Sequence, residues 1–464
     1  MLQTILKDED GFVKILIAGC GQVGETLARE LSSENHDITL LDSDPKVLET
    51  GVERYDVITV QGNCAAMQVL DQAGVKEADL LIACTGSDEL NLLCCMTAHV
   101  ANPRLHTIAR IRNPEYTEQA YRMRDAFALS MAFNPEHQAA EEIGRLLKFP
   151  GFLKRDSFAK GRVQIVEIRI DEDSKLCNVP LSSMNAIVKC RVLVCAVLRD
   201  GKAITPDGHF TLLEGDRIFV TAPADDLALL LKNLGIVTHK VRRVMIAGGG
   251  TVAYYLAEYL RQSHMDLTVL EQDRERCLEL AAKFPKVNVI CGNVKDQSLL
   301  ESEDISSVDA LVTLTGVDEL NLLISLYGHR RGVGQIVTRL DHMELSGITG
   351  DLPIGSVICP SLLCCSNIVR YVRALQNQTG AAIAIHSIAD GHAEAMEFRV
   401  DENTEHCGEP LKKIKLRHNI LLVSISRGAS IEIPNGDSCF RPGDTVVVVA
   451  SGDDVILQLN DIFA

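Results

Sequence analysis

Residues 14–44 read KILIAGCGQVGETLARELSSENHDITLLDSD, and residues 243–273 read RVMIAGGGTVAYYLAEYLRQSHMDLTVLEQD. Each stretch runs from an apolar strand through a glycine-rich turn into an amphipathic helix, and then into a second apolar strand that ends in an acid. This order raises the pattern G-x-G-x-x-G above a chance match, because a dinucleotide-binding turn joins a strand to a helix. The stretch therefore predicts a Rossmann domain, and its repetition predicts two.

The first copy has the residue types that phosphate binding needs. Gly19 permits the tight turn, Gly21 lets a pyrophosphate approach the backbone, and Gly24 lets the helix pack on the strand. The phosphates would lie on unpaired amides at the start of the helix. Asp42 ends the second strand, where a carboxylate accepts hydrogen bonds from ribose and repels a 2′-phosphate. These residues predict NAD(H) or an adenine nucleotide and exclude NADP(H); the alternative is a Rossmann turn that binds nothing.

The second copy differs at the turn. Gly248 and Gly250 are present, Glu271 is the acid, and Ala253 takes the place of the last glycine, which the motif allows. Tyr254 and Tyr255 add bulk directly after it. A nucleotide is expected here too, but the sequence leaves open whether the ligand is the same.

The repeat extends over almost the whole chain at an offset of 228–230 positions. TGSDELNLL at 85–93 matches TGVDELNLL at 315–323, and PDGHFTLLEGDRIFV at 206–220 matches PNGDSCFRPGDTVVVVA at 434–450. In each half, apolar strands first alternate with helices of about ten residues, which is typical of a parallel sheet covered on both faces. Short alternating strands follow. We therefore predict an α/β fold with two doubly wound Rossmann domains, at 12–150 and 240–377, each followed by a small α+β module, at 151–235 and 380–464.

Composition limits the function. The 464 residues carry a net charge of −17 and no block of basic residues, which disfavours nucleic acid and anionic lipid as partners. No run reaches the roughly 18 apolar residues of a membrane helix, and the N-terminus lacks signal-peptide features, so a cytoplasmic, soluble chain is expected. The 15 cysteines form no C-x-x-C or Cys/His metal pattern and are interpreted as reduced core thiols.

Two further pairs of positions lie where doubly wound sheets bind ligands. Thr85-Gly86 and Thr315-Gly316 follow the fourth strand of each half, and Arg110 and Arg339 lie on the next strand. Arg110 would contact a phosphate or a carboxylate, or else be a solvated edge residue. No acid–base group common to both halves accompanies them, so we predict no enzyme activity. The alternatives are an NAD-dependent oxidoreductase and a nucleotide sensor acting on a soluble partner.

With these motifs the chain resembles the RCK (KTN) domain family, whose members regulate potassium conductance, and the two domain pairs in tandem resemble its regulatory subunits. The resemblance implies NAD(H), with ATP or ADP as further ligands, and a homotetrameric ring that gates an integral membrane potassium transporter of the Trk type from the cytoplasmic face. It implies these nucleotide-binding residues in the first copy: Gly19, Cys20, Gly21, Gln22, Val23, Asp42, Asn63, Thr85, Gly86 and Arg110. In the second copy the counterparts are Gly248, Gly250, Glu271, Asn293, Thr315, Gly316 and Arg339. LDHMEL at 340–345 departs from IRNPEY at 111–116, which leaves open whether both copies share one ligand.

Overall fold

The computed structural model describes residues 12–34, 36–148, 152–159, 162–234, 240–342, 352–375, 382–428, 430–452, 456 and 458–464. Residues 1–11, most of the linker expected at 235–242, nearly all of the linker expected at 376–382, and residues 343–345 of the divergent LDHMEL segment lie outside them. The chain divides into two compact units. One consists of residues 1–139 with 359–377, and the other of residues 140–358 with 378–464. The domain boundaries expected from the sequence stay predictions.

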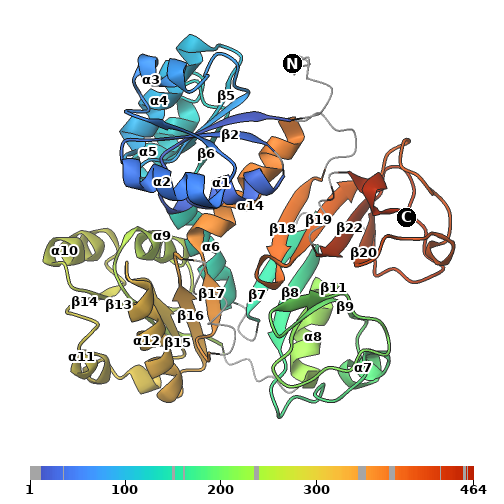
Figure 1. The fold of residues 1–464 in the computed structure, drawn as a ribbon. Helices are drawn as coiled ribbons and strands as arrows, with labels where there is room; N and C mark the ends of the chain where they lie inside the picture. The colour runs from blue at the N-terminus through green and yellow to red at the C-terminus, as the bar shows by residue number, and fades with distance from the viewer. Residues whose placement is uncertain are drawn as a thin grey trace. The chain divides into compact units, whose positions relative to one another are not determined.

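The first Rossmann sheet has six parallel strands in the order β3-β2-β1-β4-β5-β6 (Figure 1). Its strands are β1 (Lys14–Ala18), β2 (Asp37–Asp42), β3 (Ile58–Gln61), β4 (Leu80–Ala83), β5 (His106–Arg110) and β6 (Met131–Phe133). Its helices are α1 (Gln22–Ser33), α2 (Pro45–Arg54), α3 (Met67–Gln72), α4 (Asp88–Ala101) and α5 (Pro114–Arg122). The central strands β1 and β4 are apolar throughout their buried length because both faces are covered, as the sequence predicted.

The second Rossmann sheet repeats this order as β14-β13-β12-β15-β16-β17, again with parallel strands. Its strands are β12 (Arg243–Ala247), β13 (Asp266–Glu271), β14 (Asn288–Cys291), β15 (Ala310–Thr313), β16 (Gln335–Arg339) and β17 (Ser356–Ile358). Its helices are α9 (Thr251–Tyr259), α10 (Arg274–Lys283), α11 (Gln297–Ser302) and α12 (Asp318–Arg330), with a short 3₁₀ turn, η2 (Ile305–Ser307). In both sheets the strand order reverses between the first and fourth strands, which places a ligand crevice at their carboxyl ends.

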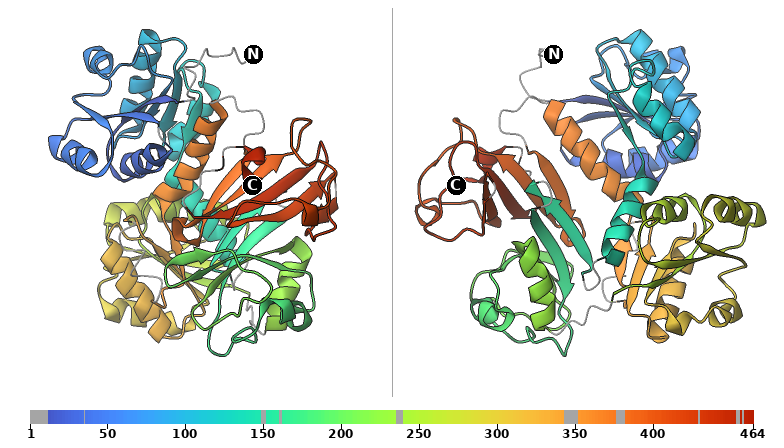
Figure 2. Two further views of the ribbon diagram at one scale, coloured as in Figure 1. Left: turned by 45° about the vertical axis from the view of Figure 1, so that its right-hand side comes forward. Right: turned by 180° about the vertical axis from the view of Figure 1, so that it is seen from behind.

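The helix after each Rossmann sheet does not stay with that sheet. Helix α14 (Pro360–Leu375), which follows the second sheet in sequence, packs on α1 of the first, and Cys364, Ile368 and Val372 share a core with Leu27 and Leu31 (Figure 2). Helix α6 (Pro135–Lys148) follows the first sheet, and its part beyond residue 139 belongs to the second unit. Helix α14 therefore belongs to the unit that contains the first sheet, and most of α6 belongs to the unit that contains the second.

The small modules are antiparallel sheets. The first has the order β10-β9-β11-β8-β7, with strands β7 (Lys154–Phe158), β8 (Val163–Arg169), β9 (Leu193–Arg199), β10 (Lys202–Ile204) and β11 (Arg217–Pro223), and helices α7 (Leu181–Val188) and α8 (Ala224–Leu234). The second has the order β18-β19-β22-β20-β21, with strands β18 (Ala384–Ile388), β19 (Ala393–Arg399), β20 (Ile420–Arg427), β21 (Ser430–Glu432) and β22 (Thr445–Ser451). Its described residues form only the short 3₁₀ turns η4 (Ala389–Gly391), η5 (Leu411–Lys413) and η6 (Leu459–Ile462).

The two small modules pack against each other through one face of each sheet. Ile165 and Phe219 of the first share a buried core with Ala395, Val423 and Val449 of the second. Backbone and side-chain hydrogen bonds cross this interface, including the Ala159 amide to Glu397 Oε2 at 2.9 Å. Because the opposite faces carry separate cores, each sheet has one face in its own module and one in the shared interface.

Candidate nucleotide-binding sites

The glycine turn of the first copy is fixed by contacts that only glycine permits. Gly19 has φ +99°, its amide donates to Leu41 O at 2.8 Å, and a Cβ there would lie 2.7 Å from the Thr85 amide nitrogen. A Cβ on Gly24 would overlap the Gly19 carbonyl oxygen. A Cβ on Gly21, by contrast, would have no atom within 4 Å. Gly19 and Gly24 thus bring strand and helix together, and Gly21 faces open space where a ligand can approach the backbone.

Helices α1 and α9 begin without a side-chain cap. Their N-cap residues are Gly21 and Gly250, and neither provides a side-chain acceptor for the amides of the first turn. Neighbouring helices differ, since Asp44 caps α2 and Asp273 caps α10. An uncapped helix N-terminus at the edge of a parallel sheet is suited to an anion, which both the amides and the helix dipole stabilise.

The acid at the end of the second strand braces the turn in both copies. Asp42 accepts from the Cys20 amide (Oδ2, 2.7 Å) and from the Asp44 amide (Oδ1, 3.0 Å). Glu271 repeats this pattern with the Gly249 amide (Oε2, 2.7 Å) and the Asp273 amide (Oε1, 2.9 Å). Each carboxylate oxygen accommodates about two hydrogen bonds, so one acceptor position per oxygen is left for ribose hydroxyls.

Of the other residues of the first turn, Gln22 is exposed and can contact a ligand through its side chain, whereas Cys20 and Val23 can do so only through the backbone. The Val23 side chain belongs to the core under α1. The Cys20 side chain is buried too, and burial, with the nearby charges of Asp42 and Glu25, raises the pKa of its thiol to about 12. Cys20 is therefore a neutral thiol at pH 7 and not a nucleophile. Asn63 and Asn293 shape the loops after β3 and β14, where their Oδ1 atoms accept from the Ala65 and Lys295 amides at 3.0 Å.

A fully buried asparagine organises the opposite side of each crevice. Asn91 Oδ1 accepts from the Thr85 amide (2.8 Å) and the Thr85 hydroxyl (2.7 Å), and its Nδ2 donates to Arg110 O (3.0 Å). Asn321 does the same for Thr315 and Arg339 at 2.9, 2.7 and 3.0 Å. The sequence analysis assigned Thr85-Gly86 and Thr315-Gly316 to the site but missed these asparagines, although the repeated TGxDELN motif contains them.

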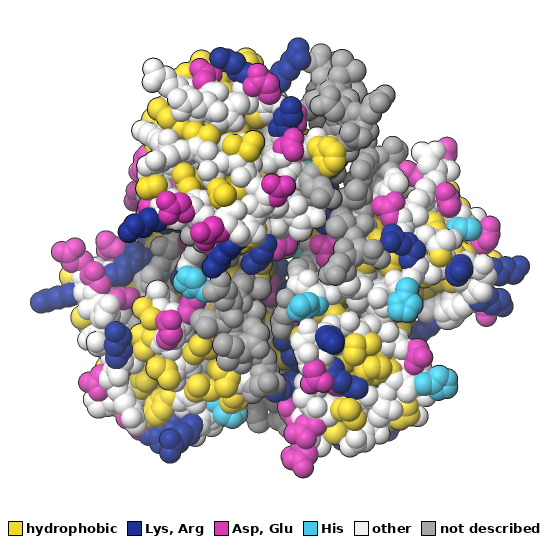
Figure 3. Space-filling view, in the orientation of Figure 1, with side chains coloured by type: hydrophobic (Ala, Val, Ile, Leu, Met, Phe, Trp, Pro, Cys, Tyr) yellow, Lys and Arg dark blue, Asp and Glu magenta, His cyan; other side chains and the backbone are white. Residues whose placement is uncertain are grey.

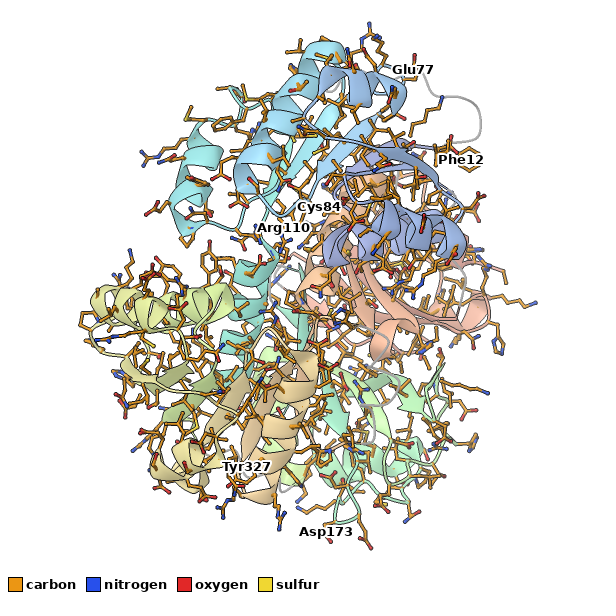
Figure 4. The ribbon with its side chains drawn as sticks, turned by 60° about the vertical axis from the view of Figure 1, so that its left-hand side comes forward. Phe12, Glu77, Cys84, Arg110, Asp173 and Tyr327 are labelled. Carbon is orange, nitrogen blue, oxygen red and sulfur yellow. The ribbon has the colours of Figure 1, made fainter. Side chains whose placement is uncertain are left out.

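The two arginines are paired with carboxylates. Arg110 Nη2 lies 2.5 Å from Oε1 of Glu136 in the first turn of α6, and both side chains are largely buried. Arg339 forms a bidentate pair with Asp341 at 2.8 and 2.9 Å. Figure 4 labels Arg110 and Cys84, which lie near each other at the end of the first sheet. Neither arginine is a solvated edge residue, and a phosphate at Arg110 would have to share it with Glu136.

The described residues include no group of three or more His, Cys, Asp or Glu placed to hold a metal ion. Across the same residues, no helix combines the length and the apolar character that crossing a membrane requires. On the face seen in Figure 3, Lys and Arg are scattered among Asp and Glu, in keeping with a chain that lacks a basic block.

Comparison with known proteins agrees with this architecture. The TrkA-N domain family matches residues 15–131 and 244–360, and the TrkA-C domain family matches residues 165–235 and 395–463. The Trk system potassium uptake protein TrkA of Haemophilus influenzae is 30% identical over 459 residues, covering 97% of this chain and 98% of that protein. TrkA of Halomonas elongata is 31% identical over 454 residues, covering 97% and 96%.

Solved structures share the fold at lower identity. The GsuK RCK domain superposes with a TM-score of 0.59 at 17% identity, covering 97% of this chain and 95% of that one. The GsuK channel bound to NAD gives a TM-score of 0.57 at 18% identity, covering 96% and 78%. Two TrkA-N and two TrkA-C domains in alternation, together with relatives matched along nearly their full length, show that this chain belongs to the TrkA family of potassium uptake proteins.

Proposed function

We propose that this chain is a cytoplasmic regulatory subunit that binds nucleotides and gates an integral membrane potassium transporter of the Trk type. The observation that carries the proposal is the duplicated site. In both copies an uncapped helix N-terminus lies beside a carboxylate that is already held in place by two backbone amides. We infer the transporter partner from the relatives, which are named as Trk system potassium uptake proteins.

NAD(H) is the proposed ligand, with ATP and ADP as further candidates that share its adenosine diphosphate part. The amides of the first helical turn would hold the phosphates, and Asp42 or Glu271 would accept from the ribose hydroxyls. A structural relative, the GsuK channel, has been solved with NAD bound. Both carboxylates would repel the 2′-phosphate of NADP(H), which therefore should bind weakly.

Two sites in one chain suit regulation rather than turnover. A ligand shifts a conformational equilibrium only by its difference in affinity for the two states, so each site can bias the same equilibrium independently. A coupling of about 1–3 kcal/mol would shift the equilibrium between the two states roughly 5–150-fold. We propose that four chains assemble on the inner face of the membrane through the transporter, and that no chemical step is involved.

Calorimetric titration with NADH, NAD, ATP, ADP and NADPH tests the sites. Asp42→Ala and Glu271→Ala should each remove one binding event. The affinity of that site should fall about 10–100-fold, the size expected for lost hydrogen bonds to a charged group of ~1.5–3 kcal/mol. Because Asp42 also braces the turn, the ratio of NADPH to NADH affinity is the sharper readout, and it should rise in Asp42→Ala. Unchanged binding in both variants, or steady oxidation of NADH by the protein, would contradict the proposal.

Potassium or rubidium flux tests the regulatory role. A potassium transporter of the Trk type, reconstituted in liposomes, should change its flux when the chain is added, and the change should depend on nucleotide. Asp42→Ala and Glu271→Ala together should abolish the nucleotide dependence. A flux that is the same with and without the chain would refute the function.

A further inference from the structure

Two cysteines lie beside the acid of the second glycine turn. Cys277 is a buried residue near the start of α10, and its thiol donates to the Glu271 carbonyl oxygen at 3.3 Å. Cys291 ends β14, where it is the register partner of Glu271 in the parallel pairing of β13 with β14. Its Sγ lies 4.0 Å from the carbonyl oxygen of Gln272, the next residue in the chain. Both sulfur atoms therefore lie at the consecutive carbonyl groups where β13 ends.

The two thiols also act on each other. The pKa of the Cys277 thiol is raised to about 11, first by burial and then by the neighbouring Cys291 thiol. Part of this rise depends on charge at Cys291, so it disappears once the Cys291 sulfur is bonded to another sulfur. This interaction and the contacts to neighbouring carbonyl groups both place the sulfur atoms close together.

The exposure of the two side chains differs in the way that thiol–disulfide exchange requires. Among the 15 cysteines, all of which lie in the described part of the chain, Cys291 alone is exposed. An exposed thiol can attack a small disulfide from solvent, whereas a buried thiol cannot reach one. Cys277 needs no such access, because its reaction partner would be Cys291 within the same domain.

The first Rossmann domain has other residues at these positions. Leu48 takes the place of Cys277 at an offset of 229, and Gln61 takes the place of Cys291 at an offset of 230. Gln61 is the register partner of Asp42, just as Cys291 is that of Glu271, so the positions are structurally equivalent. Any chemistry of the cysteine pair therefore belongs to the second copy.

We propose that Cys277 and Cys291 are a modification site, at which a small disulfide such as oxidised glutathione produces a reversible disulfide bond between them. The Cys291 thiolate attacks one glutathione sulfur, forms a mixed disulfide and displaces the other glutathione as a thiolate. Cys277 then loses its proton to water, attacks Cys291 Sγ and displaces the second glutathione. Two protein thiols are oxidised and one glutathione disulfide is reduced to two thiols, so no further reactant is needed. In a cytosolic protein such a bond is typically transient and redox-sensing.

The bond would also change the second nucleotide site, and this part of the inference rests on the proposed nucleotide binding. A covalent link replaces two separate thiols, so it draws the start of α10 towards the end of β14. The start of α10 holds the Glu271 carboxylate, because the Asp273 amide donates to its Oε1 at 2.9 Å. Asn293 shapes the loop directly after Cys291. Oxidation should therefore move the carboxylate away from the ribose hydroxyls and weaken nucleotide binding at the second site alone.

Mass spectrometry of the full chain tests the disulfide. The chain is equilibrated with mixtures of oxidised and reduced glutathione, its remaining thiols are alkylated, and its peptides are identified. A link between Cys277 and Cys291 should form before any other, and dithiothreitol should remove it. Cys64 and Cys94 are the internal control, since the Cys94 thiol donates to Cys64 O at 3.2 Å but both side chains are buried, and they should stay reduced. If Cys291 carries only glutathione and no link to Cys277 forms, the inference is overturned.

Titration with ADP tests the effect on the site. The chain carries Asp42→Ala, so that the second site dominates. Oxidation should weaken ADP binding about tenfold, as expected for the loss of one hydrogen bond to a charged group, and dithiothreitol should restore it. Cys277→Leu with Cys291→Gln installs the residues of the first copy, and Cys291→Ser changes the exposed position alone. In both controls the affinity for ADP should not respond to oxidised glutathione.

Equal ADP affinity of the oxidised and reduced chains, or the same response in the control variants, would overturn the proposed effect on the site. Failure of the proposed function is a different result, in which the reduced chain without any substitution binds neither ADP nor NADH. The glutathione experiment then still decides whether the disulfide forms, because it does not depend on a bound nucleotide.

Discussion

At the residue scale, the candidate sites depend on buried polar side chains that hold the backbone of the predicted ligand-binding residues in place. Asn91 is fully buried and joins the end of β4, through Thr85, to the end of β5, through Arg110. The structure uses Asn321 in the same way in the second copy. Since the carboxyl ends of these strands form the crevice, its width on this side is set by one amide group per copy.

Asn91→Ala should therefore loosen the first Rossmann domain and weaken nucleotide binding there. The Thr85 amide and the Arg110 carbonyl would lose their partner inside the protein, which costs about 1–3 kcal/mol for a buried group. Hydrogen exchange at the amides of β4 and β5 measures this locally. Asn321→Ala is the matched control and should reduce protection in β15 and β16 instead. Unchanged exchange in both sheets would show that the asparagines are not structural clamps.

At the element scale, the packing of α6 on α9 requires a glycine at a position where helix propensity alone would favour alanine. Gly144 lies inside α6, where alanine normally stabilises a helix by about 1 kcal/mol. In the folded chain a Cβ at this position would overlap the Tyr259 ring of α9, and Lys148, one turn later, places its Nζ 4.1 Å from the centroid of the same ring. The glycine is thus a contact point between two helices.

Gly144→Ala should destabilise the second unit, since relieving the overlap with Tyr259 costs about 1–3 kcal/mol. The sign should reverse when Tyr259→Ala is already present, because the space is then free and only helix propensity acts. Urea unfolding of the single and double variants measures both values. A stabilising effect of Gly144→Ala in the otherwise unchanged chain would mean that α6 does not pack on α9 as described.

At the scale of the whole molecule, the exchanged helix α14 ties together residues that are far apart in sequence. Arg373 of α14 pairs with Glu34, 339 positions earlier, at 2.5 Å, and both side chains are almost completely buried. Burial by itself would raise the pKa of Glu34, but the nearby His36 ring, with Nε2 3.7 Å from the carboxylate, and the hydrogen bonds from Arg373 outweigh it and hold that pKa below its ordinary value. Breaking one side of a buried pair costs about 3–5 kcal/mol.

The stability of the first unit should therefore depend on Glu34 and on acid. A carboxylate with a lowered pKa stabilises the fold above its unfolded pKa of about 4.3, and this contribution is lost as the pH falls through the lower folded value. Glu34→Gln should lower the free energy of unfolding at pH 7, and the gap to the parent chain should close below about pH 4. Glu30→Gln, which removes an exposed pair with Arg29, is the control and should change little. If the difference in free energy of unfolding between Glu34→Gln and the parent chain did not change with pH, the stabilising role of the ion pair would be refuted.

Local sequence patterns determined the repeat, the glycine turns, their acids and the two parallel sheets, and the structure confirms this fold class, because strand–turn–helix units are encoded by residues close together in the chain. Residues whose partners are distant in sequence could not be found this way. Tertiary packing decided the exchange of α6 and α14, the pairing of the small modules, and the clamps Asn91 and Asn321. In the sequence Leu280 is an ordinary apolar residue of a helix, and only the folded chain brings its Cδ1 to within 2.9 Å of the place of a Cβ on Gly249, because such contacts depend on how the helix lies on the sheet.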